Sequence, residues 1–144
     1  MKKFLSALLP VMFLSACVTY DNGYHLSTLS YSDLQHHNFV LQSFNGKQIT
    51  PQGNKMLNLA FNENQQISGS LCNNFHGAAS MAGNVMKGNM VSTLMACPDA
   101  NLNTAEQAFY QAFSKGAHLT LKGQTLTIRQ GSNTFVYQLR DYVR

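Results

Sequence analysis

The 144-residue sequence contains no run of about 20 apolar residues, the length that a membrane-spanning helix needs. It also lacks a cluster of basic residues after its first three positions. Beyond Lys2 and Lys3, eight basic side chains are scattered singly from Lys47 to Arg144. Because no positive stripe can follow a phosphate backbone, we expect no nucleic-acid partner.

The sequence also lacks a recognisable catalytic or metal-binding pattern. His76 follows Cys72 by four residues, but a nucleophile and base also need an orienting group and an oxyanion site, and neither is identifiable. His36 and His37 are adjacent, so on a strand their side chains would point to opposite faces and could not bind one metal ion. We therefore expect no catalytic residues, no metal site and no cofactor.

The first 17 residues have the pattern of an export signal. Lys2 and Lys3 precede about 13 mostly apolar residues, Phe4 to Ala16, which is too short for a spanning helix and is interrupted by Pro10. Leu14-Ser15-Ala16-Cys17 resembles the lipobox of bacterial lipoproteins. It predicts a signal peptide over residues 1–16 and a lipid on Cys17, which becomes the mature N-terminus.

Two alternatives to lipidation remain: an ordinary cleaved signal with a chance cysteine, or an uncleaved N-terminal anchor. Val18 stands where inner-membrane lipoproteins of Gram-negative bacteria carry aspartate. By resemblance to that sorting rule, we expect a protein anchored in the outer membrane by lipid and facing the periplasm.

The remaining cysteines agree with export. Once Cys17 carries lipid, Cys72 and Cys97 form a pair in an oxidising compartment, where a disulfide is the default expectation. Such a bridge would close a loop of about 25 residues and contribute roughly 3 kcal/mol by the chain-entropy estimate. The alternative is two buried thiols that serve as small apolar core residues.

Three segments follow from the composition along the chain. Residues 17–33 comprise the lipidated N-terminus and a polar stretch without hydrophobic period, which predicts a flexible tether. A flexible chain of about 16 residues spans roughly 20–24 Å on average. Residues 34–144 are enough for one domain with a core, but not for two.

Alternating apolar residues predict short strands through most of this domain. Phe39 to Phe44 ends at Asn45-Gly46, a dipeptide that favours a tight hairpin turn. Leu119 to Leu139 has the pattern of a three-stranded antiparallel meander with turns at Gly123 and Gly131. The other expected strands are Leu57 to Phe61, Ile67 to Leu71, Ala78 to Met81, Val85 to Lys87 and Met90 to Met95, with a turn at Gly88-Asn89 between the last two.

One segment has helical period. Apolar residues from Ala105 to Phe113 recur at spacings of three and four, which predicts a helix from about Thr104 to Lys115. Thr104 and Gln107 have the spacing of a capping box, and Gly116 can end the helix in a left-handed conformation. The expected fold is mainly β (α+β), with about eight antiparallel strands and one inserted helix.

Two separated motifs carry a family resemblance. Ser68 to Gly77, with Thr93 to Pro98 before the helix, resembles the META domain, and His36 to Leu41 and Asn45 to Lys47 resemble its HslJ-type heat-shock lipoproteins. The resemblance implies a small cone- or barrel-like β-structure, a link to heat and envelope stress and to novobiocin resistance, and no enzymatic activity. Phe39 and Leu71 depart from the family pattern, which often has tryptophan and glycine there.

Two groups of residues are candidates for binding. Asn73, Asn74 and Phe75 follow Cys72 in a loop and are the candidate partner-binding residues, although asparagines also serve turns through their own backbone. Four methionines between Met81 and Met95 fill an irregular core or line a groove for peptide or lipid.

We therefore expect a monomeric, non-enzymatic lipoprotein that acts in the envelope-stress response by binding an unidentified periplasmic or outer-membrane protein. One alternative is a carrier of small molecules or lipids, with an apolar cavity under a helix that carries Phe109 and Phe113. Another is an inhibitor of a cell-wall hydrolase.

Overall fold

The computed structural model describes residues 28–51 and 53–141. The predicted signal peptide, Cys17 and most of the predicted tether lie outside these ranges. The elements are α1 (Tyr31–Leu34), β1 (Asn38–Phe44), β2 (Lys47–Gln48), β3 (Asn58–Phe61), the 3₁₀ turn η1 (Glu63–Gln65), β4 (Gln66–Ser70), β5 (Asn74–Ala82), β6 (Val85–Ser92), α2 (Ala100–Lys115), β7 (Ala117–Lys122), β8 (Thr125–Gln130) and β9 (Asn133–Leu139).

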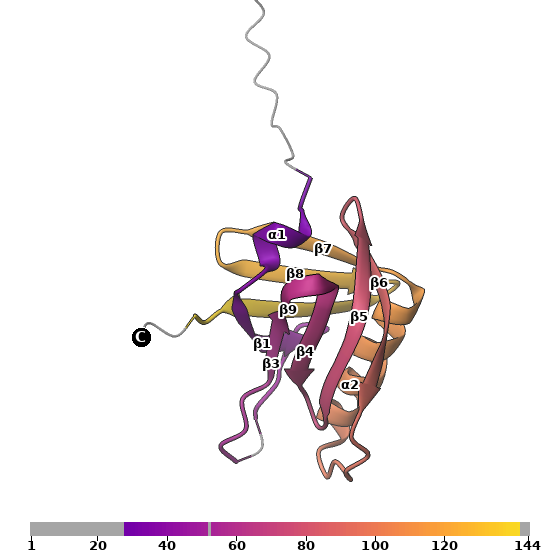
Figure 1. Ribbon diagram of the computed structural model, residues 1–144. Coiled ribbons are helices and arrows are strands. Elements are labelled where there is room, and N and C mark those ends of the chain that lie inside the picture. The colour runs from indigo at the N-terminus through magenta and orange to yellow at the C-terminus, as the bar shows by residue number, and fades with distance from the viewer. Residues whose placement is uncertain (1–27, 52, 142–144) are drawn as a thin grey trace, which may run out of the picture.

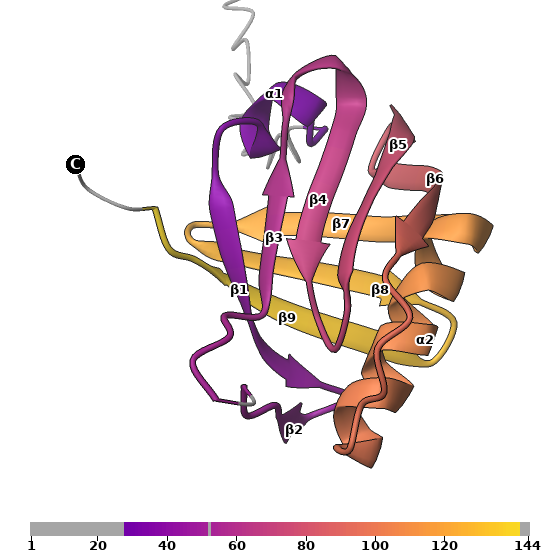
Figure 2. The ribbon, with the colours of Figure 1, turned by 60° about the horizontal axis from the view of Figure 1, so that its bottom comes forward.

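The strands form an antiparallel barrel that closes on itself (Figures 1 and 2). From β3 onward each strand pairs with the next along the chain, and β1 pairs with both β3 and β9. The closing pair places Phe39 opposite Leu139 and Phe44 opposite Phe135. Eight strands make the barrel, and β2 adds a short extra strand to β1. The expected mainly β fold with one main helix is confirmed.

A bulge in β1 explains why this strand directs side chains into the core both before and after the register shift. Its pairing with β9 shifts between Leu41 and Ser43. An extra residue in one strand reverses the alternation beyond it. Leu41 and Phe44 therefore both point inward, although three positions separate them, and both are buried. The asparagine and glycine after Phe44 have φ angles of 49° and 78°, as the expected tight turn requires.

Aromatic rings fill the interior of the barrel. Phe109 of α2 lies at the centre, with ring centroids 4.7 Å from Phe113, 5.0 Å from Phe75 and 5.6 Å from Phe135. The largest fully buried side chains include Phe39, Phe61, Phe109, Phe113, Phe135 and Tyr137. These rings occupy the space beneath α2 in which a carrier would hold its ligand.

Helix α2 begins four residues earlier than the expected start at Thr104. Its N-cap is Asp99, whose side chain accepts hydrogen bonds from the backbone amides of Asn101 and Leu102. Thr104 therefore lies inside the helix, where its hydroxyl donates to the carbonyl of Ala100. The expected capping box was wrong, because the apolar stripe continues back to the buried Leu102. The helix ends at Gly116 as expected, with a positive φ of 113°, but its ψ of 107° lies outside the left-handed helical region.

Strand β6 differs from the sequence prediction. We expected two strands separated by a turn at Gly88 and Asn89, but Val85 to Ser92 is one continuous strand. A Cβ atom on Gly88 would lie 2.2 Å from the carbonyl oxygen of Ala78 on β5. The glycine thus allows two backbones to approach closely and does not form a turn.

The last residues of the predicted tether are part of the folded structure. Helix α1 includes Tyr31 and Asp33, and it lies at one end of the barrel (Figure 1). The Tyr31 hydroxyl lies 2.7 Å from the carbonyl oxygen of Asn62 and 2.9 Å from that of Gln66, and Leu34 is fully buried. Within the described ranges, neither α1 nor α2 is long and apolar enough to cross a bilayer.

Candidate functional site

The three candidate partner-binding residues lie where the chain turns from β4 into β5, at the end of the barrel opposite α1 (Figure 1). Asn73 ends the turn, and Asn74 and Phe75 begin β5. Only Asn74 is exposed. Asn73 is 6% exposed and Phe75 is buried. The expectation that all three side chains face a partner therefore needs correction, because the turn folds two of them inward.

Phe75 belongs to the aromatic core. Its ring packs against Phe109 and, edge to face, against Tyr110 of α2. A Cβ atom on Gly69 would lie 2.6 Å from the ring of Phe75, so the adjacent strand β4 needs glycine at that position. Phe75 thus fixes the start of β5 against the helix.

Asn73 is held from inside by a buried carboxylate. Glu106 of α2 is 1% exposed, and its two oxygens accept hydrogen bonds from the backbone N–H of Asn73 at 2.6 Å and from the side-chain amide at 2.7 Å. Buried charges are tolerated when hydrogen bonds of this kind compensate for lost hydration. Helix α2 therefore fixes the β4–β5 turn.

The opposite side of the same asparagine holds the loop between β6 and α2. Its side-chain oxygen accepts hydrogen bonds from the backbone N–H of Met95 at 2.6 Å and from the Thr93 hydroxyl at 3.0 Å. The side-chain nitrogen of Asn73 donates to Glu106, and its side-chain oxygen accepts hydrogen bonds from this loop. One buried side chain therefore connects the helix, the turn and residues 93–95.

Cys72 and Cys97 lie at the base of the same loop. Their Cα atoms are 5.7 Å apart, which is within the usual range for disulfides. The ammonium of Lys55 donates a hydrogen bond of 2.7 Å to the carbonyl of Cys72. The predicted disulfide would thus join the turn before Asn73 to the end of the loop that Asn73 holds.

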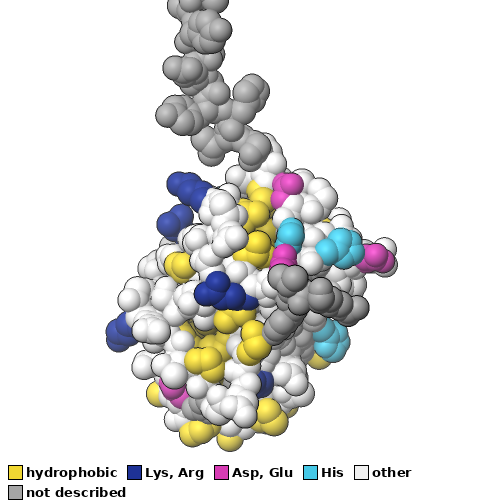
Figure 3. Space-filling view, turned by 90° about the vertical axis from the view of Figure 1, so that its left-hand side faces the viewer, with side chains coloured by type: hydrophobic (Ala, Val, Ile, Leu, Met, Phe, Trp, Pro, Cys, Tyr) yellow, Lys and Arg dark blue, Asp and Glu magenta, His cyan; other side chains and the backbone are white. Residues whose placement is uncertain are grey.

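This loop carries large apolar side chains into solvent. Leu94 is 96% exposed, Met95 57%, and Val91 of β6 63%. We call these three side chains the distal apolar surface. Figure 3 shows apolar side chains gathered at the lower end of the molecule, the end opposite α1.

Beside the distal apolar surface lies an open groove of about 290 Å³. Its lining residues are Asn74, Phe75, His76, Val91, Ser92 and Thr93. Asn74, the exposed member of the three predicted residues, therefore borders the groove.

The methionines divide between the two roles left open by the sequence. Met86 is fully buried in the core, and Met81 and Met90 pack partly buried against it. Met95 instead belongs to the distal apolar surface. Core filling is confirmed for Met86, whereas Met95 is not a core residue.

The titratable groups near the site are structural. Burial raises the pKa of Tyr110 to about 12 and also raises the pKa of the fully buried Tyr137. In residues 28–51 and 53–141, no three His, Cys, Asp or Glu side chains lie close enough to hold a metal ion. His76 is exposed on β5, with Ser68 and Val91 as its cross-strand neighbours.

Sequence reasoning missed Glu106, the residue that organises this end of the barrel. A signal was present, because Glu106 lies four positions after Leu102 and three before Phe109. A residue at those spacings shares the buried face of the helix. A carboxylate on an apolar stripe indicates a buried polar partner, here Asn73.

Comparison with known proteins agrees with the fold. The model of the META domain family matches residues 32–142. Heat shock protein HslJ of Escherichia coli (strain K12) is 31% identical over 142 residues, which cover 98% of each chain.

Two solved NMR structures share the architecture. One is 31% identical, with a TM-score of 0.71, and the match covers 77% of this chain and 95% of the other. A protein from Burkholderia xenovorans has a TM-score of 0.60 at 16% identity, over 78% of this chain and 87% of its own, and shows the fold alone. The extent of the family match and the identity to HslJ lead to one conclusion: this chain belongs to the META domain family.

Proposed function

We propose that the protein is a lipoprotein of the outer membrane that faces the periplasm and acts in the heat and envelope-stress response without enzymatic activity. It would do so by binding a protein partner through the distal apolar surface. The lipobox-like segment ending at Cys17 supports the anchor, and the similarity to heat shock protein HslJ supports the stress role.

The observation that carries the proposal is the exposure of Leu94 on a loop held from within. Because Leu94 is 96% exposed, burial of its side chain contributes almost no free energy to the stability of the free protein. Asn73, which buried hydrogen bonds fix to Glu106, nevertheless holds Thr93 and Met95 on either side of Leu94 through partly buried hydrogen bonds. Because an ordered loop loses little entropy on binding, these contacts preorganise the surface for a partner.

The position of this surface suits a partner away from the anchoring membrane. Described residues begin near α1, at the end of the barrel opposite the loop (Figure 1). The eleven residues from Cys17 to residue 27 reach at most roughly 40 Å when fully extended. The lipid would therefore hold the α1 end toward the membrane and leave Leu94 directed into the periplasm.

Site-specific photocrosslinking in cells tests the partner. A photoreactive residue at position 94 should capture a defined protein, with a higher yield after heat stress. The same residue at Lys122, an exposed position in the β7–β8 hairpin, serves as the matched control. Equal crosslinking at both positions would contradict the proposal.

The substitution Leu94→Asp gives a second test. It should remove the crosslinked partner, detected from a photoreactive residue at Asn74, and leave the thermal midpoint nearly unchanged, because Leu94 is exposed. A strain that carries only this variant should lose heat and novobiocin tolerance as a deletion strain does. Unchanged capture from Asn74 would contradict a role for this surface.

A further inference from the structure

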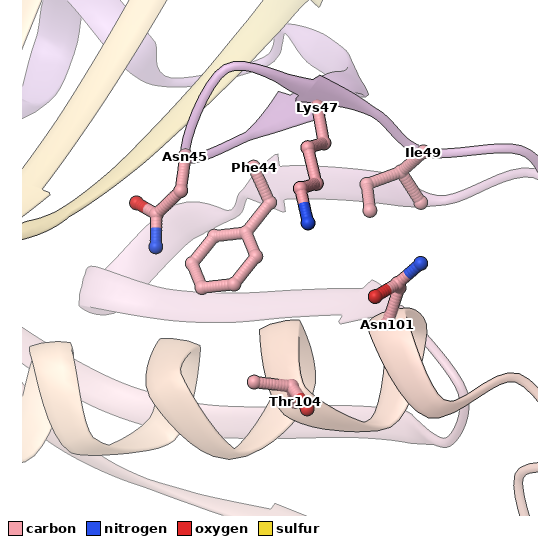
Figure 4. A pocket seen from close by; sticks show the side chains of 6 residues that line it. All are labelled: Phe44, Asn45, Lys47, Ile49, Asn101 and Thr104. Atoms are coloured by element: carbon pink, nitrogen blue, oxygen red, sulfur yellow. The ribbon is translucent and has the colours of Figure 1, made fainter.

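A second concave site lies between the β1–β2 hairpin and the first turns of α2 (Figure 4). It is an open slot of about 160 Å³. Its lining residues are Phe44, Asn45, Lys47, Ile49, Asn101 and Thr104. The volume is below the roughly 300 Å³ at which pockets for drug-sized ligands begin, so only a small group fits.

The slot has apolar walls and a cation directed into it. Lys47 pairs with Phe44 across the hairpin, which places both side chains on the same face of the two strands. Phe44 and Ile49 are buried and supply the apolar walls. Figure 4 shows the Lys47 side chain directed toward α2, with its ammonium between the Phe44 ring and Asn101.

The ammonium of Lys47 has no partner in the part of the chain that the structure describes. The ion pair found there is the distant one between His37 and Asp141. The nearest acidic residue along α2, Asp99, directs one carboxylate oxygen to the amides of Asn101 and Leu102. The Asn101 side chain likewise makes no hydrogen bond within the described ranges. Figure 4 shows the amide oxygen of Asn101 on the side of Lys47 and the amide nitrogen turned away from it. In the described residues, the exposed ammonium of Lys47 is therefore the cation at the edge of an apolar slot.

We propose that this slot binds a carboxylate on a short apolar stem. Lys47 would pair with the carboxylate in a charge-assisted hydrogen bond. The stem would lie on Phe44 and Ile49. The carboxylate belongs either to a free small acid or to the C-terminus of a peptide. This site is separate from the distal apolar surface and does not depend on the proposed function.

Chemical shifts of the ¹⁵N-labelled full chain, titrated at pH 7 and constant salt, test the site. Butyrate should shift the backbone amides of residues 44–49 and 101–104, whereas butyramide, which has the same stem without the charge, should not. Shifts that are absent, located elsewhere, or equal for the two compounds would overturn the proposal.

Two exposed lysines provide matched variants. Lys47→Gln should weaken butyrate binding about tenfold, the loss expected for one hydrogen bond to a charged group. Lys122→Gln removes the same charge from a different hairpin and should leave the affinity unchanged. Equal affinity in the two variants would show that Lys47 does not bind the ligand.

A third pair of titrations identifies the source of the carboxylate. A tripeptide ending in leucine with a free carboxylate is compared with its C-terminal amide. Tighter binding of the free-carboxylate peptide than of butyrate would identify a peptide terminus, and the reverse order would identify a free acid. Binding of neither acid would overturn the proposal for both sources.

Discussion

Glu106 accepts two hydrogen bonds from Asn73, one from the backbone N–H and one from the side-chain amide. Replacing the carboxylate with an amide, Glu106→Gln, would place an NH₂ donor against one of these donors. We expect the free energy of unfolding to fall by about 2–3 kcal/mol, the value typical of buried hydrogen bonds to charged groups. Urea denaturation measures the change.

The neighbouring Gln107 provides the control for this variant, because it is exposed on the same helix. Gln107→Ala should stay within about 0.5 kcal/mol of the unsubstituted protein. In Glu106→Gln, the amide of Met95 should also exchange faster with deuterium, since Asn73 then holds the loop less firmly. Equal stability of the two variants would contradict the assigned role of Glu106.

The predicted disulfide between Cys72 and Cys97 should contribute about 3 kcal/mol, as expected for a closed loop of 25 residues. The double variant Cys72→Ser, Cys97→Ser should therefore unfold at a lower temperature, and reductant should lower the midpoint of the unsubstituted protein in the same way. Thiol labelling of the oxidised, denatured protein gives a direct check. Labelling at both positions would rule the bridge out.

Gly77 is another position at which a single methyl group should be costly. A Cβ atom there would lie 2.3 Å from the carbonyl oxygen of Asn89, on strand β6, which pairs with the β5 strand that carries Gly77. Gly77→Ala should lower the free energy of unfolding by more than about 2 kcal/mol, because the β5 and β6 backbones must separate.

Gly131 is the matched control for Gly77, since it has a φ of 56° and open space around it. Asparagine tolerates this conformation, so Gly131→Asn should cost less than about 1 kcal/mol. The thermal midpoint of Gly77→Ala should therefore be lower than that of Gly131→Asn. A Gly77→Ala protein as stable as Gly131→Asn would show that the barrel adjusts at this contact.

Asp141 should make stability depend on acid pH. The backbone N–H of Asn38 and the His37 ring lower the pKa of this carboxyl below its ordinary value of 3.8. A lowered pKa means that the contribution is fully present above the unfolded value and is lost as pH falls through the folded value. The stability difference between the unsubstituted protein and Asp141→Asn should therefore shrink below about pH 4. Because the pair is exposed, the difference at pH 7 should stay below about 1 kcal/mol.

Cys17 gives a prediction outside the described residues. If it carries lipid, radiolabelled palmitate should enter the protein, and Cys17→Ser should lose both the label and the sedimentation with outer membranes. Two acyl chains are enough for stable anchoring, whereas one is marginal. An unmodified mature chain that begins at another residue would contradict the lipoprotein prediction.

Much of the fold could be predicted because its strands alternate simply. The meander from Leu119 to Leu139 buries alternate residues, Leu126 and Ile128 in β8 and Phe135 and Tyr137 in β9, and both turns lie where the glycines indicated. Two of the errors have one cause: a glycine or a threonine fits more than one structural role. Gly88 allows close contact with the backbone of β5, which lies outside the local sequence, and Thr104 lies within a helix that Asp99 caps.

The candidate site was less predictable. Four consecutive residues, Ser70 to Asn73, are buried beneath the loop that follows β6, and neither strand nor helix periodicity produces such a run. Leu94 was expected in a strand ending at Met95, but the strand ends at Ser92. Its exposure follows from contacts of Asn73 with residues about 20 positions away, which a pattern within one segment does not contain.

The pairing of β1 with β9 also affects how the chain acquires its structure. In the closed barrel, Phe39 of β1 pairs with Leu139 of β9, which lies near the other end of the domain sequence. A chain delivered from its N-terminus, by a ribosome or an export channel, cannot close the barrel until its last strand has emerged. Closure joins residues about 100 positions apart and is therefore expected to be a late, entropically costly step. Until then β1 keeps one unpaired edge, the stage at which this protein is most exposed to aggregation.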